Sequence, residues 1–213
     1  MNKTEFATME DILAVAPVVP VVKVHTPDAG VRVAQALVRG GVPVIELTLR
    51  TSAALETIRA IAEEVPEILL GAGTVTTPEQ VALVVEAGAR FIVTPGAPHA
   101  LQQAVLDAGV PALLGASTLT EMMQLASQGW RTLKFFPAEA AGGTKFLASV
   151  RGPLPELRFC PTGGINIGNA PEYLELPNIA AVGGSWLTPD VAVESGDWEL
   201  IEKLAREAAA LQS

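Results

Sequence analysis

Short aliphatic runs alternate with helix-like segments along almost the whole chain, and this alternation restricts the possible folds more than any other feature. Most of the runs are hydrophobic throughout, which is typical of parallel strands that are buried on both faces. Parallel strands need long crossover connections, and the segments between the runs are long enough to be helices. The eight expected strands are residues 18–22, 42–49, 68–73, 90–94, 111–115, 131–136, 157–161 and 179–183.

The connecting segments complete the expected architecture. Helices are expected at residues 28–39, 52–64, 78–86, 98–107, 119–127, 143–150 and 171–175, with one more before the first strand at 8–16 and a closing helix at 198–211. Eight strand–helix units in 213 residues fit an α/β fold, a closed (β/α)8 TIM barrel with an extra N-terminal helix. No linker divides the chain, so we expect residues 1–213 to form a single barrel domain.

An open doubly wound sheet is the structural alternative. Its dinucleotide-binding form carries a Gly-x-Gly-x-x-Gly fingerprint after the first strand, and this sequence has none there. A weak internal repeat supports a unit of one helix plus one strand, because a glycine ends each of four helix-like runs just before an aliphatic run. We expect C′ positions with a left-handed backbone at Gly41, Gly88, Gly109 and Gly129.

Composition and charge exclude several classes of protein. Hydrophobic residues make up 49% of the chain and the mean hydropathy is +0.37, which excludes a disordered chain. The longest apolar stretch, residues 12–22, is broken by Pro17 and Pro20 and is too short to span a membrane. Acidic residues outnumber basic ones, 23 to 14, so the formal charge of −9 disfavours nucleic acid as a partner.

The cysteine content and the N-terminal residues indicate the compartment. Cys160 is the only cysteine, so no intrachain disulfide and no cluster of thiolate ligands can form. A chain of this kind is typical of a reducing, intracellular compartment. Glu5, Glu10 and Asp11 also differ from the basic start of a secretory signal. We therefore expect a cytoplasmic protein.

The second expected strand carries polar residues on one side. The two-residue period places Glu46, Thr48 and Arg50 on that side, which we expect to face the barrel interior. A buried pair of Glu46 and Arg50 with a purely structural role is one interpretation. Active sites of these barrels form at the carboxyl ends of the strands, however, and this position favours a function.

Lys134 lies in the middle of the sixth expected strand, on the same side as Thr132 and Phe136. Burying an ammonium group is costly unless it is paired or loses its proton, and a neutral lysine amine is a nucleophile. With Glu46 as a proton shuttle, such an amine predicts imine chemistry on a ketone or aldehyde. A lysine that only extends to the barrel mouth is the simpler alternative.

Glycine turns follow the seventh and eighth expected strands, at residues 162–164 and 183–185. In (β/α)8 barrels the loops after these strands commonly bind a phosphate group through backbone N–H groups, and glycine allows close approach. Tight strand exits without a ligand are the alternative.

A metal site is not expected, because His25 and His99 are far apart in sequence and no ligand-like spacing accompanies them. Cys160 lacks a basic partner in its strand and is expected to be a core residue.

Five motifs follow one another along nearly the whole chain: Val44-Ile-Glu-Leu-Thr-Leu-Arg50, Gly71-Ala-Gly-Thr-Val75, Lys134-Phe-Phe-Pro-Ala-Glu139, Arg158-Phe-Cys-Pro-Thr-Gly-Gly164 and Val182-Gly-Gly-Ser-Trp186. In order and register they closely resemble the 2-keto-3-deoxy-6-phosphogluconate (KDPG) aldolase / 4-hydroxy-2-oxoglutarate aldolase family. The resemblance implies a class I, metal-independent aldehyde-lyase on a (β/α)8 barrel. It also implies a homotrimer without a cofactor that serves the Entner-Doudoroff pathway of carbohydrate metabolism.

The resemblance also implies a role for each motif residue. Lys134 would form the Schiff base and Glu46 would be the general acid/base. Arg50 and Thr74 would bind the carboxylate of the substrate. The residues implied to contact the rest of the substrate are Phe136, Thr162 and Pro95, and those implied to bind its phosphate are Gly163, Gly164, Gly184 and Ser185. Residues 114–118 and His99 depart from the family pattern, and Thr162 favours the gluconate substrate over the galactose-derived one.

The expected reaction is the cleavage of KDPG to pyruvate and glyceraldehyde 3-phosphate, and the resemblance also names 4-hydroxy-2-oxoglutarate as a second substrate. The expected partner is thus a small phosphorylated keto acid. One alternative is a phosphosugar isomerase or epimerase, in which Glu46 is the base and Lys134 an electrostatic clamp. Another is a barrel that binds a phosphorylated ligand without turnover. Neither alternative requires a lysine in the middle of an aliphatic strand.

Overall fold

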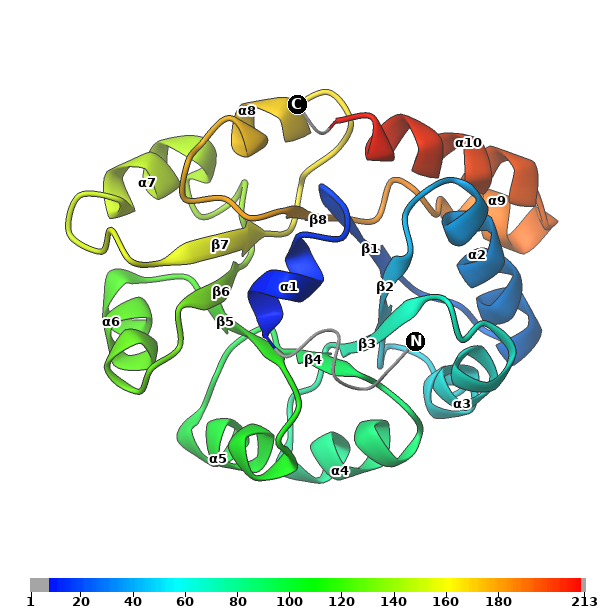
Figure 1. Ribbon diagram of the computed structural model, residues 1–213, viewed down its shortest axis with the longest axis horizontal. Helices are drawn as coiled ribbons and strands as arrows, with labels where there is room; N and C mark the ends of the chain where they lie inside the picture. Colours follow the sequence, from blue (N-terminus) through cyan, green and yellow to red (C-terminus); the bar gives the residue numbers. More distant parts are fainter. Residues whose placement is uncertain (1–7, 212–213) are drawn as a thin grey trace.

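The computed structural model describes residues 8–211, in which eight parallel strands form a nearly closed barrel (Figure 1). The strands are β1 (Val18–Val22), β2 (Val44–Thr48), β3 (Leu69–Gly73), β4 (Phe91–Val93), β5 (Ala112–Ala116), β6 (Thr132–Phe135), β7 (Arg158–Pro161) and β8 (Val182–Gly184). They pair in the order β7-β6-β5-β4-β3-β2-β1-β8. Isolated bridges from Phe159 to Ile179 and from Thr162 to Gly183 join the remaining edges. The expected (β/α)8 barrel is confirmed.

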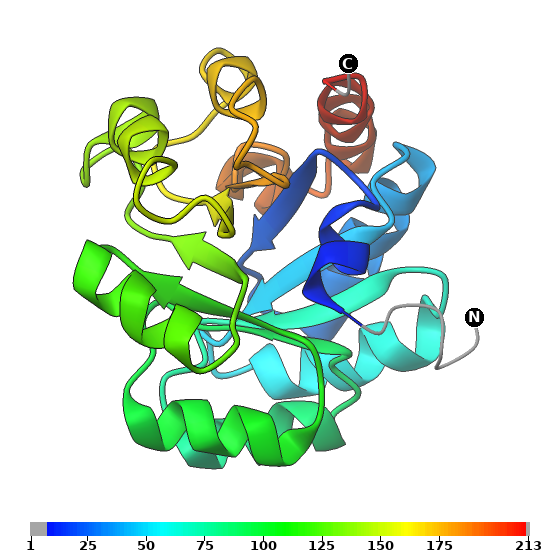
Figure 2. The ribbon, with the colours of Figure 1, turned by 60° about the vertical axis from the view of Figure 1, so that its left-hand side comes forward.

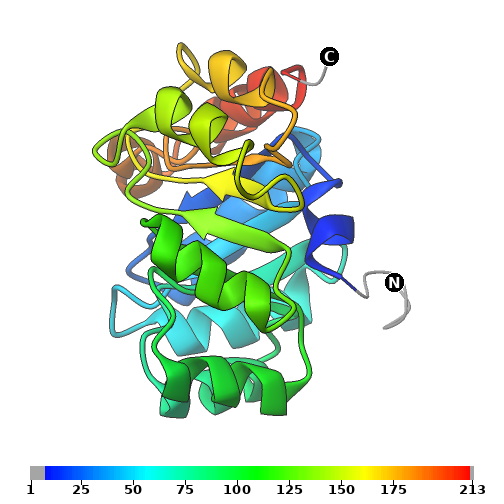
Figure 3. The ribbon, with the colours of Figure 1, turned by 90° about the vertical axis from the view of Figure 1, so that its left-hand side faces the viewer.

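Helices surround the strands on the outside, as Figures 2 and 3 show from two further directions. They are α2 (Pro27–Arg39), α3 (Ala54–Glu64), α4 (Pro78–Glu86), α5 (His99–Ala108), α6 (Leu119–Ser127), α7 (Gly143–Val150), α8 (Ala170–Leu174), α9 (Asp190–Ser195) and α10 (Trp198–Ala209). Threonine caps begin three of them, because the side chains of Thr26, Thr77 and Thr118 accept hydrogen bonds from backbone N–H groups of the first turn. Among these helices and α1 (Met9–Leu13), none is long and apolar enough to cross a membrane.

Helix α1 lies across the N-terminal end of the barrel, at the centre of Figure 1. Thr8 and Asp11 form its capping box, and the side chains of Ile12 and Leu13 are buried. The Thr132 hydroxyl at the start of β6 donates to the Glu10 carboxylate over 3.3 Å. The helix is shorter than the expected 8–16, because Thr8 caps it and residues 14–17 lead into β1.

The expected left-handed backbone is confirmed at all four glycines, of which Gly41, Gly88 and Gly129 are C′ residues and Gly109 is the C-cap of α5 itself. Their φ angles are +85° at Gly41, +106° at Gly88, +65° at Gly109 and +95° at Gly129. Residues with a Cβ are strained in this left-handed region. Each of these glycines therefore ends a helix and redirects the chain toward the next strand.

Three differences from the expected elements have a common physical reason. β2 and β4 are shorter than expected, and β8 covers Val182–Gly184 in place of 179–183. Ile179 is buried beside β7, but an isolated bridge to Phe159 is its strand pairing. A run of aliphatic residues indicates that a segment is buried, but it does not show which of its residues are hydrogen-bonded to a neighbouring strand. The six-residue helix α9 was not expected, because the pattern of one helix after each strand has no place for a second helix between β8 and α10.

Candidate active site

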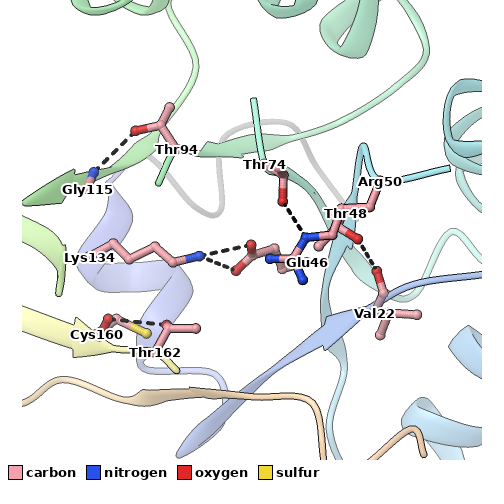
Figure 4. A network of polar contacts seen from close by, with 10 residues as sticks. All are labelled: Val22, Glu46, Thr48, Arg50, Thr74, Thr94, Gly115, Lys134, Cys160 and Thr162. Atoms are coloured by element: carbon pink, nitrogen blue, oxygen red, sulfur yellow. Dashed lines mark hydrogen bonds and ion pairs between the residues drawn. The ribbon is translucent and has the colours of Figure 1, made fainter. Parts of the chain in front are cut away.

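Lys134 on β6 and Glu46 on β2 meet inside the barrel, although they are 88 residues apart in the sequence. The Lys134 Nζ lies 3.1 Å from Oε1 and 3.4 Å from Oε2 of Glu46 (Figure 4). The two side chains are 5% and 3% exposed. An ion pair this deeply buried is costly to desolvate, so its presence is better explained by chemistry than by stability.

Small residues lie beside this pair. Lys134 lies in register with Gly115 on β5 and Cys160 on β7. At the other end of the pair, a Cβ on Gly73 would lie 2.2 Å from the Glu46 Oε1. A side chain at Gly73 would therefore displace the carboxylate, so glycine is required there for a steric reason.

Cys160 is a buried neighbour of Lys134. Burial raises the pKa of its thiol to about 12, although the positive charge of Lys134 acts in the opposite direction. The thiol is therefore neutral at physiological pH and is a poor nucleophile. The structure confirms the interpretation of Cys160 as a core residue.

Arg50 and Thr74 form a second polar pair beside the first one. The Arg50 Nε donates to the Thr74 Oγ1 over 3.1 Å (Figure 4). Thr74 has a φ of +59°, which is rare for a β-branched residue and is typical of strained positions at functional sites. An exposed guanidinium at a barrel mouth suits a carboxylate ligand.

The buried partner of Glu46 is Lys134, whereas Arg50 is exposed. The alternative of a structural Glu46–Arg50 pair is therefore wrong.

Phe136, Thr162 and Pro95 lie at the same end of the barrel. The Phe136 ring centroid is 5.6 Å from the Lys134 Nζ, and the Phe136–Pro137 peptide bond is cis. The Phe136 carbonyl accepts a hydrogen bond from the Ser117 hydroxyl over 2.5 Å. Thr162 follows β7 and is 6% exposed, while Pro95 is half-buried in the loop after β4.

The glycine turns after β7 and β8 are neighbours in space. Gly163 and Gly164 have φ angles of +105° and +81°, and Thr162 forms a bridge with Gly183. A Cβ on Gly183 would lie 2.2 Å from the Thr162 Oγ1. Successive backbone N–H groups in turns of this kind form concave anion-binding sites. Gly184 and the exposed Ser185 follow directly, so all four residues expected to contact the phosphate lie at the same barrel mouth.

Several supporting residues were not singled out from the sequence. Ser117, Glu139 and Tyr173 hold loops around the site through the hydrogen bond to Phe136 and one from the Tyr173 hydroxyl to Glu139. Glu139 lies within a recognised motif, so a signal existed for it. Tyr173 lies in a short helix outside the motifs, and its sequence context carried no signal. Within residues 8–211, no group of three or more His, Cys, Asp or Glu side chains is placed to hold a metal ion.

Comparisons with known proteins agree with this geometry. A family model described as "Aldolase: KDPG and KHG aldolase" matches residues 9–204. The chain is 51% identical over 201 residues to the 2-dehydro-3-deoxy-phosphogluconate aldolase of Dickeya dadantii, covering 94% of each chain. It is 50% identical over 199 residues to the KHG/KDPG aldolase of Escherichia coli, covering 93% of each.

A solved structure extends the match to the three-dimensional fold. The KDPG aldolase of Legionella pneumophila, with pyruvate captured at low pH as a covalent carbinolamine intermediate, is 41% identical and superposes with a TM-score of 0.92. The alignment covers 94% of this chain and 97% of that one. On the family model, the sequence identities and the shared barrel, the chain belongs to the KDPG and KHG aldolase family.

Proposed function

We propose that the protein is a class I aldolase that cleaves KDPG to pyruvate and glyceraldehyde 3-phosphate, the aldol step of the Entner-Doudoroff pathway. The observation that carries the proposal is the Lys134 amine held against the Glu46 carboxylate inside the barrel. An isomerase with Lys134 as an electrostatic clamp would need no covalent bond to this amine. The related Legionella structure holds pyruvate covalently, which favours the aldolase.

The first stage of the reaction is imine formation. Neutral Lys134 attacks the C2 carbonyl carbon of KDPG, giving a carbinolamine, and loss of water gives an iminium ion. Glu46 lies within hydrogen-bond distance of the Nζ, so it can accept its proton before the attack and then return that proton to the carbinolamine hydroxyl, which leaves as water. The positively charged iminium nitrogen then accepts electrons from the bond that breaks.

The second stage is carbon–carbon cleavage. Glu46, directly or through a water molecule, takes the proton of the C4 hydroxyl, the C3–C4 bond breaks and glyceraldehyde 3-phosphate leaves. The electron pair of that bond forms a pyruvyl enamine on Lys134. Protonation of C3 regenerates the iminium, and its hydrolysis releases pyruvate and restores the amine.

The remaining residues would bind the substrate along its length. Arg50 and Thr74, which already form a hydrogen-bonded pair, would bind the pyruvyl carboxylate. Phe136 would pack on the pyruvyl group, Thr162 would contact a hydroxyl, and Pro95 would line the site from the loop after β4. The turns containing Gly163, Gly164, Gly184 and Ser185 would bind the phosphate. A second activity on 4-hydroxy-2-oxoglutarate fits the same carboxylate site and the same imine.

A coupled assay of pyruvate release from KDPG tests the proposal. The wild-type protein should release pyruvate, and Lys134→Ala should lose the activity by about 10⁴-fold or more, because the covalent path is closed. Lys145→Ala removes an exposed lysine of α7 as a matched control and should remain active. Full turnover by Lys134→Ala would contradict the mechanism, and ligand binding without pyruvate release would indicate a non-catalytic barrel.

We further propose that residues 1–213 form one domain and that three copies assemble into a cytoplasmic homotrimer. Continuous strand pairing from β7 to β8 supports the single domain. Large exposed apolar side chains on the consecutive helices α5 and α6 support an assembly, because contact between copies would bury them. They are Leu106, Leu119 and Met123, which are 52%, 42% and 58% exposed.

A further inference from the structure

The glycine turn after β7 is attached to the loop after β6 by two backbone hydrogen bonds. The Ala138 N–H donates to the Thr162 carbonyl over 2.8 Å, and the Glu139 N–H donates to the Gly163 carbonyl over 3.1 Å. In a trans peptide the N–H points away from the carbonyl of the preceding residue. The two bonds therefore turn the N–H groups of Gly163 and Gly164 away from the loop after β6.

The Glu139 side chain packs against this turn. A Cβ on Gly164 would lie 2.6 Å from the Cγ and 2.7 Å from the Cβ of Glu139. The Asn169 amide also donates to the Gly164 carbonyl over 3.2 Å. The backbone of Gly164 therefore contacts both Glu139 and Asn169, and a shift of the Glu139 side chain would remove one of these two supports.

Tyr173 on α8 fixes the position of Glu139. Its hydroxyl donates a hydrogen bond to the Glu139 Oε1, and the tyrosine is 1% exposed. Burial and the neighbouring carboxylate both raise the pKa of Tyr173 above its ordinary value, so the hydroxyl keeps its proton and remains a donor. A Cβ on Gly143, at the start of α7, would lie 3.1 Å from this hydroxyl and 3.2 Å from the carboxylate. The pair therefore occupies a close-packed junction of α7, α8 and the glycine turn.

We propose that Tyr173 and Glu139 are positioning residues that set the preference for a phosphorylated substrate. They act by holding the N–H groups of the turn at Gly163 and Gly164 in the orientation that receives the phosphate. The inference rests on the proposed function, because it assumes that the phosphate of KDPG binds at this turn. The Lys134–Glu46 pair binds the other end of the substrate and does not depend on Tyr173.

The test compares KDPG with its unphosphorylated counterpart, 2-keto-3-deoxygluconate, so that the two substrates differ by the phosphate alone. Tyr173→Phe keeps the ring and removes the hydrogen bond to a charged group. It should lower kcat/KM for KDPG by about tenfold, mainly through KM, and leave kcat/KM for the unphosphorylated substrate within about twofold. Glu139→Gln, which can still accept from Tyr173, should have a smaller effect than Glu139→Ala.

Two further variants complete the design. Tyr173→Phe in the Glu139→Ala background should add little, because the pair is already broken. Glu172→Gln, which removes an exposed carboxylate next to Tyr173 on the same helix, is the matched control and should preserve the substrate ratio. An equal loss on both substrates would overturn the inference in favour of a general packing role, and an unchanged KM for KDPG would overturn it directly. A wild-type protein that releases no pyruvate from KDPG would contradict the proposed function itself, and this inference with it.

Discussion

At the scale of single residues, Lys134 needs space inside the barrel and a nearby group that accepts its proton. Gly115 and Cys160 lie in register with Lys134 on the neighbouring strands, and the backbone of Pro95 packs directly against Gly115. Glu46 approaches from across the interior with both carboxylate oxygens within 3.4 Å of the Nζ. A base held this close can serve both the imine and the substrate hydroxyl.

Replacing Glu46 by Gln should affect the cleavage of KDPG and the formation of the imine to different extents. The amide keeps the size of the side chain but cannot accept a proton, so kcat for KDPG cleavage should fall by about 10²–10⁴-fold. Pyruvate should still form a reducible imine with Lys134, although more slowly. Steady-state kinetics and reductive trapping measure the two effects, and an unchanged kcat would show that another group moves the protons.

The buried thiol of Cys160 predicts a pH-dependent stability. Its folded pKa of about 12 lies above that of the unfolded chain, which is about 8.5. The contribution to stability is therefore complete below about pH 8.5 and is lost progressively as the pH rises from there toward 12. A thiol reagent such as DTNB at pH 8 should leave the native protein unmodified and react on unfolding. Rapid modification of the folded protein would contradict the burial of this group.

At the scale of elements, the positive φ angles of the glycines at the helix ends predict how much a side chain would destabilise each turn. Gly129 has a φ of +95°, and a Cβ added there would meet no atom within 4 Å. Gly129→Ala should therefore lower the free energy of unfolding by about 1 kcal/mol from backbone strain alone, with kcat unchanged. Denaturant titration measures the change. Gly152→Ala, at a glycine without a positive φ, is the control and should be close to neutral.

The sequence predicted the barrel because helices and buried strands alternate along the chain, and a left-handed glycine ends four of the helices. It also predicted that Lys134 and Glu46 face the barrel interior, because the two-residue period of a strand can be followed within a short stretch of sequence. The shifted β8 and the short helix α9 could not be predicted, since pairing across the barrel leaves no period in the chain and α9 is an addition to the pattern of one helix after each strand. The strained φ of Thr74 and the contact between Tyr173 and Glu139 likewise depend on tertiary packing.

At the scale of the whole molecule, the last helix packs against the first helix of the barrel. The Arg39 Nε on α2 lies 2.9 Å from a carboxylate oxygen of Glu202 on α10, and the Arg39 guanidinium lowers the pKa of that carboxyl. A Cβ on Gly40 would lie 2.4 Å from the Ala205 Cβ, so glycine allows the close packing of the two helices. The last and first units of the barrel are thus joined twice, by the packing of α10 on α2 outside and by the pairing of β8 with β1.

The proposed homotrimer predicts a mass in solution of three times 22.2 kDa. Sedimentation equilibrium measures it, and Met123→Glu on α6 tests whether this exposed face takes part, because a charge at a buried contact is costly. Thr120→Glu, on the same helix at an exposed polar position, is the matched control. A mass of 22.2 kDa for the wild-type protein would contradict the trimer.

The central claim is a covalent bond between Lys134 and the substrate, and one measurement tests it most directly. The folded protein is incubated with pyruvate, reduced with borohydride and analysed by intact mass and peptide mapping, with Lys145→Ala and Lys134→Ala in parallel. We predict one reduced pyruvyl group per chain, on Lys134, in the wild-type protein and in Lys145→Ala, and none in Lys134→Ala. A folded wild-type protein that gains no adduct in excess pyruvate, or gains it at another lysine, would contradict the account.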